Sequence, residues 1–350
     1  MRVSVIGAGV AGLACAVELA ERGAAVEVLE RGERLGAGCC SWFAGGMLAP
    51  WCELESAEPL IATLGCESLA WWRAHLPQTH LNGSLVVAHG RDLGELARFA
   101  RRTQAFEWVG SERIGELEPA LAGRFHRALF FPEEGHLDPR AALGALARRL
   151  EALAVPIRYG TDGAAMGGPL CGERRAARAP GEAGFAIDCT GLAARGALDG
   201  LRGVKGEMLI LRLPELALAR PVRVLHPRLP LYVVPRGEGV FMVGATMIES
   251  DQPSRVSVRS MLELLSGAYA LDPALGEAEI LEIGTGVRPA FHDNLPRIVR
   301  RGRTIFVNGL YRHGFLLAPA LARRVAELVL EGRTAPEVMA DEDSRERRLA

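Results

Sequence analysis

The chain has 350 residues, more than one hydrophobic core usually supports, so two closely joined domains are expected. Hydrophobic residues make up 49% and charged residues 24%, as in an ordinary folded soluble protein. The formal net charge of −1 excludes the basic surface of a protein that binds nucleic acid or an anionic membrane, although a few arginines could still hold a small anionic substrate.

The chain opens with an apolar run at residues 3–6, typical of a β-strand, and a helical segment follows at residues 10–22. Between them lie Gly7, Gly9 and Gly12 in the spacing GxGxxG. In a dinucleotide-binding βαβ unit these glycines permit the tight turn, the approach of a pyrophosphate, and the close packing of helix on strand. The phosphates would lie against N–H groups at the N-terminus of the helix.

A second apolar run at residues 24–30 ends in Glu30, near the ~20-residue distance at which an acidic side chain binds a ribose hydroxyl. Strand, glycines, helix, strand and acid in this order indicate a nucleotide-binding α/β fold. The apolar start does not fit a secretory signal, because its glycines and Glu18 interrupt it and no cleavage site follows. It is also shorter than the ~20 apolar residues of a membrane span, so a cytoplasmic protein is expected.

The cysteines also bear on the compartment. The seven cysteines, at positions 15, 39, 40, 52, 66, 171 and 189, show no CxxC spacing. Adjacent Cys39 and Cys40 suit neither a structural disulfide nor a zinc site. We therefore expect reduced, mostly buried thiols and no metal site.

The next part of the chain is expected to be a ligand-facing loop and a helix. Residues 36–53 are small, apolar and glycine-rich, so their backbone can come close to a flat ligand. Residues 57–76 have the apolar spacing of a helix, in which Trp71 and Trp72 are interpreted as packing residues.

Short elements fill the middle of the chain. Residues 81–91 indicate a turn and a strand, with a helical run after them. Asp138 as N-cap and Pro139 in the first position predict a helix over residues 136–153. Residues 161–184 lack periodicity and are expected to form a surface loop.

Strands dominate the third quarter of the chain. Residues 185–191 read as a strand that ends in a glycine turn. Residues 204–246 contain strand after strand separated by turn residues, which favours an antiparallel sheet. A helix is expected over residues 256–269.

The C-terminal part is expected to return to the α/β style. Strand-like segments lie at residues 280–289 and 304–314, and a helix over residues 319–331 would end at Gly332. Residues 341–350 are charged and are expected to form a solvated tail.

These elements predict an α/β protein with a Rossmann-like domain built from discontinuous segments and an inserted antiparallel or mixed-sheet substrate domain. The first domain would comprise residues 1–80, 136–200 and 282–340, and the second residues 81–135 and 201–281. Dehydrogenases that use NAD usually keep the nucleotide-binding half intact, so this interruption favours a flavin.

Several segments together resemble the D-amino acid oxidase family, and within it the glycine oxidases of bacterial thiamine thiazole biosynthesis. The resemblance covers nearly the whole chain in order. It rests on VSVIGAGVAGLACAVELAERG at residues 3–23, AGGML at 44–48, YVVPRGEGVFMVGAT at 232–246, GVRP at 286–289 and GLYRHGFLLAPA at 309–320.

The resemblance implies tightly bound FAD. Its pyrophosphate and ribose would contact Gly7, Gly9, Val10, Ala11, Gly12, Glu30 and Arg31. Its flavin would contact Cys40, Ser41, Gly45, Gly46 and Met47, and the backbone of Leu310, Tyr311, Arg312, His313, Gly314, Phe315 and Leu316. The helix at Pro319 would direct its positive end toward the pyrimidine part of the ring. Gly163 is the candidate for adenine contact, and the segment AFHDNLP carries no cysteine for covalent attachment, so noncovalent FAD is expected.

The same resemblance supplies substrate-binding candidates. Arg288 would hold a carboxylate through its planar guanidinium, although most arginines at strand ends are surface residues. Tyr232 would bind the same carboxylate or pack in a half-buried position. Arg312 would orient the substrate or pair with a local carboxylate. His313 is interpreted as structural, and Met47 as either a flavin contact or core filler.

The implied reaction is oxidation of a small amino acid to its imine, with oxygen reduced to hydrogen peroxide. The imine would hydrolyse to glyoxylate and ammonia or enter thiazole synthesis. A D-amino acid or sarcosine oxidase or dehydrogenase is the alternative within the family, and a non-catalytic FAD-binding maturation factor is the alternative of another class. The substrate partner would be a small amino acid with a free carboxylate; no nucleic-acid or membrane partner is expected, and the resemblance allows a homo-oligomer.

Overall fold

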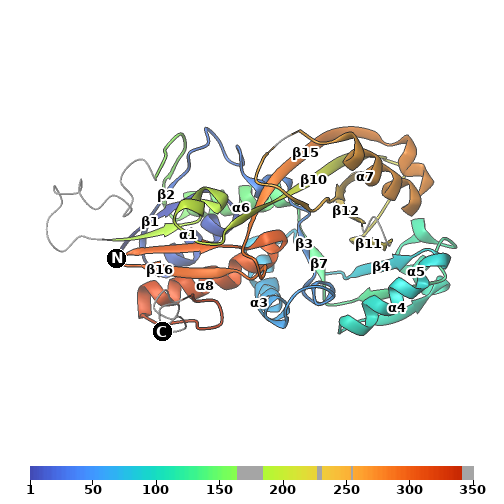
Figure 1. Cartoon of the computed structure of the whole chain (residues 1–350), viewed down its shortest axis with the longest axis horizontal. Helices are drawn as coiled ribbons and strands as arrows, with labels where there is room; N and C mark the ends of the chain where they lie inside the picture. The colour runs from blue at the N-terminus through green and yellow to red at the C-terminus, as the bar shows by residue number, and fades with distance from the viewer. Residues whose placement is uncertain (164–183, 227–230, 254, 341–350) are drawn as a thin grey trace.

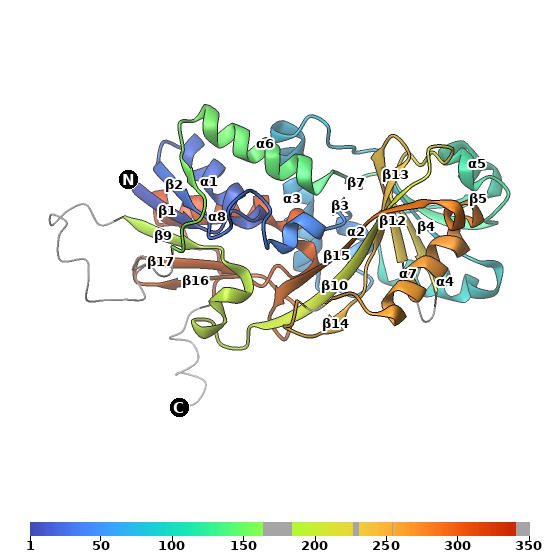
Figure 2. The ribbon, with the colours of Figure 1, turned by 90° about the horizontal axis from the view of Figure 1, so that it is seen from above.

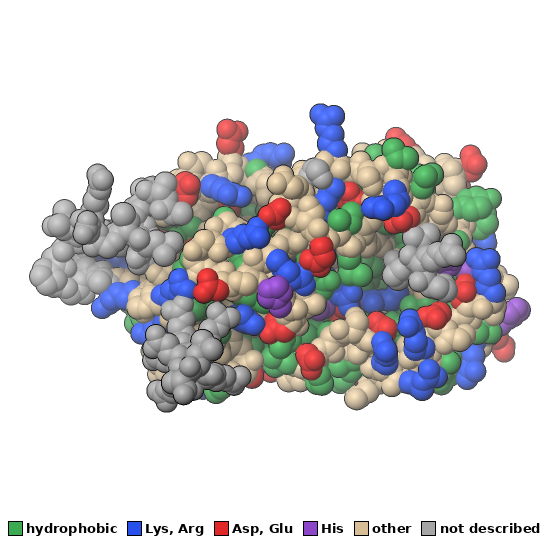
Figure 3. All heavy atoms as spheres, in the orientation of Figure 1, with side chains coloured by type: hydrophobic (Ala, Val, Ile, Leu, Met, Phe, Trp, Pro, Cys, Tyr) green, Lys and Arg blue, Asp and Glu red, His purple; other side chains and the backbone are tan. Residues whose placement is uncertain are grey.

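The computed structural model describes residues 1–163, 184–226, 231–253 and 255–340. These residues form two lobes side by side, each built on its own β-sheet (Figure 1). Lys and Arg side chains are interspersed with Asp and Glu side chains over the face shown in Figure 3, in keeping with the small net charge. No helix of the described residues is both long and apolar enough to cross a membrane.

The first lobe contains a sheet whose strand order is β16-β17-β9-β1-β2-β8. The predicted βαβ unit is confirmed: β1 and β2 pair in parallel, with α1 between them in the chain. The strands are β1 (Arg2–Ile6), β2 (Ala25–Leu29), β8 (Ile157–Arg158), β9 (Phe185–Asp188), β16 (Arg297–Arg301) and β17 (Thr304–Asn308). The helices are α1 (Val10–Glu21), α3 (Pro59–His75), α6 (Pro139–Ala152) and α8 (Gly314–Glu331).

The helices of this lobe pack on one another as well as on the sheet. Helix α1 contacts α6 and α8, and α8 contacts α3, so their apolar faces share one core (Figure 2). Asp138 caps α6 as predicted, because its side chain accepts hydrogen bonds from the backbone N–H groups of Arg140 and Ala141 at 2.7 and 2.8 Å. Trp72 is fully buried in this core, as expected of a packing residue.

The second lobe contains a larger mixed sheet with the order β14-β10-β13-β12-β11-β4-β6-β5, in which β15 also pairs with β10. Most pairs are antiparallel, and β11 with β4 is parallel. The strands are β4 (Ser84–Ala88), β5 (Glu107–Gly110), β6 (Arg127–Phe131), β10 (Arg202–Arg212), β11 (Val222–Leu225), β12 (Leu231–Gly237), β13 (Val240–Gly244), β14 (Ile248–Glu249) and β15 (Glu279–Ala290). The helices are α4 (Leu93–Arg102), α5 (Ser111–Leu117) and α7 (Val258–Leu271). The predicted two-sheet α/β fold class is confirmed.

Two short elements connect the lobes within the predicted loop of residues 36–53. Strand β3 (Met47–Leu48) pairs with β7 (Gly135–His136), and α2 (Pro50–Glu53) follows it. A 3-10 turn, η1 (Cys40–Phe43), lies before them. The segment is therefore more ordered than the loop that its composition predicted.

The prediction for residues 280–289 needs correction. These residues do not return to the α/β lobe, because β15 pairs antiparallel with β10 along its whole length (Figure 2). The domain boundary expected at residue 282 falls inside this strand, and we propose a boundary after Ala290 instead. An isolated strand pattern says nothing about which sheet it joins, since the pairing partner lies about 80 residues earlier, a separation that local periodicity cannot register.

The C-terminal helix also begins earlier than predicted. Helix α8 starts at Gly314, so Pro319 lies inside it and not in its first turn. Proline has no N–H to donate to the carbonyl four residues earlier, which belongs to Phe315. The indole Nε1 of Trp72 donates to that carbonyl at 2.6 Å and replaces the missing partner. Gly332 ends the helix in the left-handed conformation, as predicted.

The remaining predictions concern loops and cysteines. Residues 161–163 are irregular, while residues 164–183 and the tail at residues 341–350 lie outside the described residues. Six cysteines are described and each is a free thiol; Cys15 and Cys52 are buried and the other four are partly buried. Among the described residues no group of three or more potential metal ligands comes together.

Candidate active site

The glycine turn after β1 has the geometry of a phosphate cradle. Gly7 has φ +100°, and its N–H donates to the carbonyl of Leu29 at 2.8 Å, so the turn is tied to the end of β2. A Cβ on Gly12 would lie 1.9 Å from the carbonyl oxygen of Gly7, so only glycine permits this contact. Gly9 caps α1 without a side chain, and the N–H of Val10 in the first turn donates to Oγ of Ser41 at 3.2 Å. The positive end of the helix thus lies at this turn.

Glu30 is fixed beside this turn. Its Oε2 accepts from the N–H of Ala8 at 2.6 Å and its Oε1 from the N–H of Gly32 at 2.7 Å. Each oxygen retains a second lone pair that can accept a hydroxyl. Gly163 lies close by, since a Cβ there would meet Ile6 at 2.9 Å, whereas Arg31 is exposed. The two candidates for ribose and adenine contact therefore lie at the ends of β1 and β2.

A cavity of about 540 Å³ lies between the lobes and adjoins the turn through Val10. It brings together residues from both lobes that the sequence singled out: Val10, Cys40, Ser41, Gly45, Gly46, Met47, Tyr232, Arg288, Tyr311, Arg312, His313, Gly314, Phe315 and Leu316. The other candidates do not line it: Gly7, Gly9, Ala11, Gly12, Glu30, Arg31, Gly163 and Leu310. The first group surrounds the cavity and the second mostly follows the turn.

Arg288 reaches the cavity by lying across β10. A Cβ on Gly206 would be 2.1 Å from Nη2 of Arg288, so a glycine at this position makes room for the guanidinium. Nη1 donates to the carbonyl of Thr246 at 3.2 Å. Among the described residues no carboxylate forms an ion pair with Arg288, which leaves its charge available to a ligand.

Glycines also make room for packing on the face of β15 that carries Arg288. Residues 284, 286 and 288 alternate onto one face of the strand. Cβ atoms on Gly284 and Gly286 would meet Phe43 at 2.6 Å and Cys40 at 3.2 Å. The η1 turn therefore packs directly on β15, and burial raises the pKa of the Cys40 thiol to about 12.

Tyr232 lies on β12, opposite Gly244, with its ring against two glycines. Cβ atoms on Gly45 and Gly244 would meet the ring at 2.8 and 2.9 Å. The neighbouring Arg236 holds this loop, since its guanidinium donates to the carbonyls of Ala44 and Gly45 at 3.1 and 2.9 Å. Burial raises the pKa of the Tyr232 hydroxyl, so it remains a hydrogen-bond donor.

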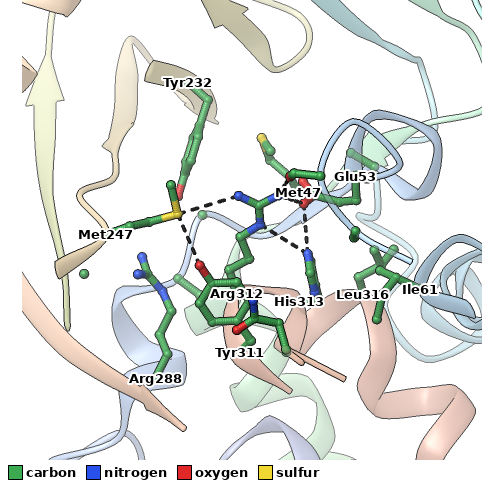
Figure 4. Close-up of a pocket in the computed structure, with 18 of the residues that line it drawn as sticks. Met47, Glu53, Ile61, Tyr232, Met247, Arg288, Tyr311, Arg312, His313 and Leu316 are labelled. Atoms are coloured by element: carbon green, nitrogen blue, oxygen red, sulfur yellow. Dashed lines mark hydrogen bonds and ion pairs between the residues drawn. The ribbon is translucent and has the colours of Figure 1, made fainter. Parts of the chain in front are cut away.

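Arg312 is paired with a carboxylate that the sequence analysis did not single out. Its Nη2 lies 2.7 Å from Oε2 of Glu53, and Nε2 of His313 lies 2.9 Å from the same oxygen (Figure 4). Oε1 of Glu53 accepts from Nη2 of Arg223 at 2.8 Å. Burial alone would raise the pKa of Glu53, but the charges of Arg312 and Arg223 and the hydrogen bond from His313 hold it well below its usual range.

The pairing of Arg312 with a local carboxylate is one of the two alternatives that the sequence left open. Burial lowers the pKa of His313, which supports its structural interpretation. Met47 lines the cavity and also packs on an apolar cluster, as expected of core filler, while its contact with a flavin stays a prediction. The sequence analysis missed the ion pairs of Glu53. The signal that could have indicated them is Arg223, a charged residue inside the otherwise apolar strand β11.

A second buried carboxylate, that of Glu134, lies next to the segment that carries Glu53. Glu134 accepts from the backbone N–H of Cys52 at 2.7 Å and from the hydroxyl of Ser84. Burial raises the pKa of Glu134 to about 7.

Helix α8 directs its N-terminus into the cavity. Gly314, Phe315 and Leu316 form its first turn and line the cavity, and no side chain caps this end. The partial positive charge of the helix therefore faces the cavity from Gly314, five residues before the predicted start at Pro319. A phosphate cradle, an acid beside it and a cavity lined by a helix N-terminus together fit a flavin dinucleotide.

Comparisons with known proteins agree with this geometry. A family model described as DAO, FAD dependent oxidoreductase, matches residues 2–328. A Rhizobium etli protein that carries the provisional name thiamine biosynthesis oxidoreductase ThiO is 54% identical over 338 residues, which cover 96% of this chain and 99% of that protein. A glycine oxidase from Geobacillus kaustophilus is 30% identical over 376 residues, which cover 95% and 94% of the two chains.

A solved structure is similar over the same extent. Iminodiacetate oxidase (IdaA) from Chelativorans sp. BNC1 superimposes with a TM-score of 0.77 at 25% identity, covering 95% of this chain and 96% of that one. The similarity of fold therefore includes both lobes.

Proposed function

The chain belongs to the DAO family of FAD-dependent oxidoreductases, as its sequence resemblance predicted, and on that premise we propose that it oxidises glycine for thiamine biosynthesis. The product would be the imine of glyoxylate, which either hydrolyses to glyoxylate and ammonia or enters thiazole synthesis. The relative named ThiO and the glycine oxidase relative support this assignment. The observation that carries it is Arg288, a guanidinium without an ion pair among the described residues, in a cavity of about 540 Å³.

We assign FAD to the glycine turn, Glu30 and the cavity wall formed by η1, Met47 and the first turn of α8. When bound, FAD supplies the acceptor of two electrons and the route by which oxygen becomes hydrogen peroxide. Noncovalent binding is part of the proposal. Cys40 lines the cavity, but its pKa of about 12 keeps the thiol protonated and unreactive toward the ring.

We assign the substrate carboxylate to Arg288 and Tyr232. The planar guanidinium suits bidentate capture, and the hydroxyl of Tyr232 can donate a further hydrogen bond. Phe43, Met47 and Leu231 add apolar surface to the lining. Such surroundings favour the neutral amine over the ammonium, and the anchored carboxylate fixes the orientation of the Cα–H bond.

The test is to mix the FAD-loaded protein without air with glycine, sarcosine or D-alanine and to follow the absorbance of the oxidised flavin. Fastest loss with glycine, and formation of peroxide after air is admitted, support the proposal. Fastest loss with sarcosine or D-alanine would assign the alternative oxidases or dehydrogenases. No loss with any amino acid would favour the non-catalytic maturation factor.

A further inference from the structure

We propose that Glu53 determines the specificity of the site, by pairing with Arg312 so that the cavity accepts substrates with one carboxylate and rejects those with two. The inference rests on the proposed function, because it concerns which amino acids the same cavity takes. Glu53 would act through Arg312, as a positioning residue, and would not contact the reacting atoms.

Three of the arginines that line the cavity, Arg223, Arg288 and Arg312, differ in their partners. Arg312 and Arg223 share Glu53, at 2.7 Å from Oε2 and 2.8 Å from Oε1. Arg288 instead donates to the carbonyl of Thr246. The side chain of Glu53 is only 8% exposed, so water does little to screen its pairs. The one negative charge of Glu53 is thus shared between two of the chain's own arginines.

Arg288 and Arg312 lie close enough to serve one ligand. Nη1 of Arg288 donates to the carbonyl of Thr246 at 3.2 Å, and Nη1 of Arg312 lies 3.6 Å from Sδ of the next residue, Met247. The two guanidinium groups therefore flank one dipeptide at the cavity (Figure 4). A second carboxylate on a substrate held by Arg288 would approach Arg312 and, in the present chain, would meet Glu53.

Glu53 opposes that approach in two ways. Its Oε2 occupies Nη2 of Arg312, and its negative charge repels a second carboxylate in a poorly screened place. A repulsive group directed against the wrong ligand is a general route to specificity. Replacement of Glu53 by a neutral residue should therefore improve the binding of dicarboxylates and leave that of monocarboxylates nearly unchanged.

The direct test compares the wild type with E53Q, using glycine and iminodiacetate, which is a glycine unit with a second carboxymethyl group. We expect the ratio of kcat/KM for iminodiacetate to kcat/KM for glycine to rise about tenfold or more in E53Q, in line with a charged hydrogen bond gained. E53D keeps the charge and is the matched control, with a ratio close to that of the wild type. An unchanged ratio in FAD-loaded E53Q would overturn the proposal.

A binding measurement separates this inference from the proposed reaction. Acetate and malonate are not oxidised, and their dissociation constants can be titrated from changes in the flavin spectrum. E53Q should bind malonate about tenfold more tightly relative to acetate than the wild type does. This expectation does not depend on whether the wild type oxidises glycine. Failure to oxidise glycine would contradict only the proposed function.

E53Q leaves two buried arginines with excess charge and risks a folding defect. The double variant E53Q/R312Q removes one charge of each sign and preserves the net charge of the wall. If Glu53 already holds Arg312 in the wild type, the double variant should bind acetate within about threefold of the wild type. A loss of tenfold or more would mean that Arg312 itself binds the carboxylate, and the proposal would fail.

Discussion

Glycines shape both the nucleotide turn and the substrate cavity, but they serve different partners. At residues 7–12 the missing side chains make room for backbone, as where α1 passes the carbonyl of Gly7. Around the cavity, Gly206, Gly45 and Gly244 make room for the chain's own Arg288 and Tyr232. The first region is contiguous in sequence and the second is assembled from distant strands. Cofactor binding should therefore depend on one short segment, and substrate binding on pairings between distant ones.

The largest effect should come from the turn. Gly12→Val would place its Cβ about 1.9 Å from the carbonyl of Gly7, so α1 must move away from β1 and the cradle is lost. We expect a protein purified without FAD, measured by the ratio of absorbance at the flavin band to that of the protein. Gly94→Ala, where a Cβ meets nothing, is the control and should retain FAD. Normal FAD content in Gly12→Val would refute the role of the turn.

The next effect should separate substrate binding from cofactor binding. Gly206→Ala pushes against the guanidinium of Arg288, so FAD should be retained while kcat/KM for glycine falls about 100-fold, the scale of a lost buried charge pair. Gly110→Ala, in the same sheet but with open space at the Cβ, should have wild-type kinetics. Steady-state peroxide production measures both variants. Equal kinetics in the two would show that Arg288 does not hold the substrate.

A smaller effect tests how a distant residue supports the cavity wall. Trp72→Phe removes the donor to the carbonyl of Phe315, and a buried carbonyl left without a partner costs about 1–3 kcal/mol of unfolding free energy. Denaturant unfolding measures this loss. Adding Pro319→Ala restores a helix N–H for the same carbonyl and should recover part of it. A double variant no more stable than Trp72→Phe would contradict this explanation.

The smallest effect is a dependence of the unfolding free energy on pH, caused by the buried carboxyl group of Glu134. Because burial raises the pKa of Glu134 from 4.5 to about 7, the folded chain keeps a proton between these values that the unfolded chain releases. The contribution of Glu134 to the free energy of unfolding therefore falls as pH rises from 4.5 to 7 and is constant above that. Glu134→Gln should therefore become more stable relative to the wild type as the pH rises through this window. Parallel stability profiles for the two proteins would exclude a raised pKa at Glu134.

The contrast between a contiguous turn and a cavity assembled from distant strands also explains which features could be predicted from the sequence. The turn at residues 7–12 and Glu30 follow a local pattern whose physical reason is known, so their arrangement could be predicted from the chain alone. The ion pairs of Glu53 could not be predicted in this way, because its partners lie at positions 223 and 312 and only folding brings the three residues together. Pro319 predicts the start of a helix, because proline favours that position. The indole that replaces its missing N–H inside α8 comes from another helix.

A crystal structure of the FAD-loaded protein with acetate tests the central claim most directly, because it locates a carboxylate that the protein cannot oxidise. The account predicts that its oxygens lie about 3 Å from the guanidinium of Arg288 and the hydroxyl of Tyr232, with the pair between Glu53 and Arg312 intact. Acetate bound to Arg312, with Glu53 displaced, would contradict it.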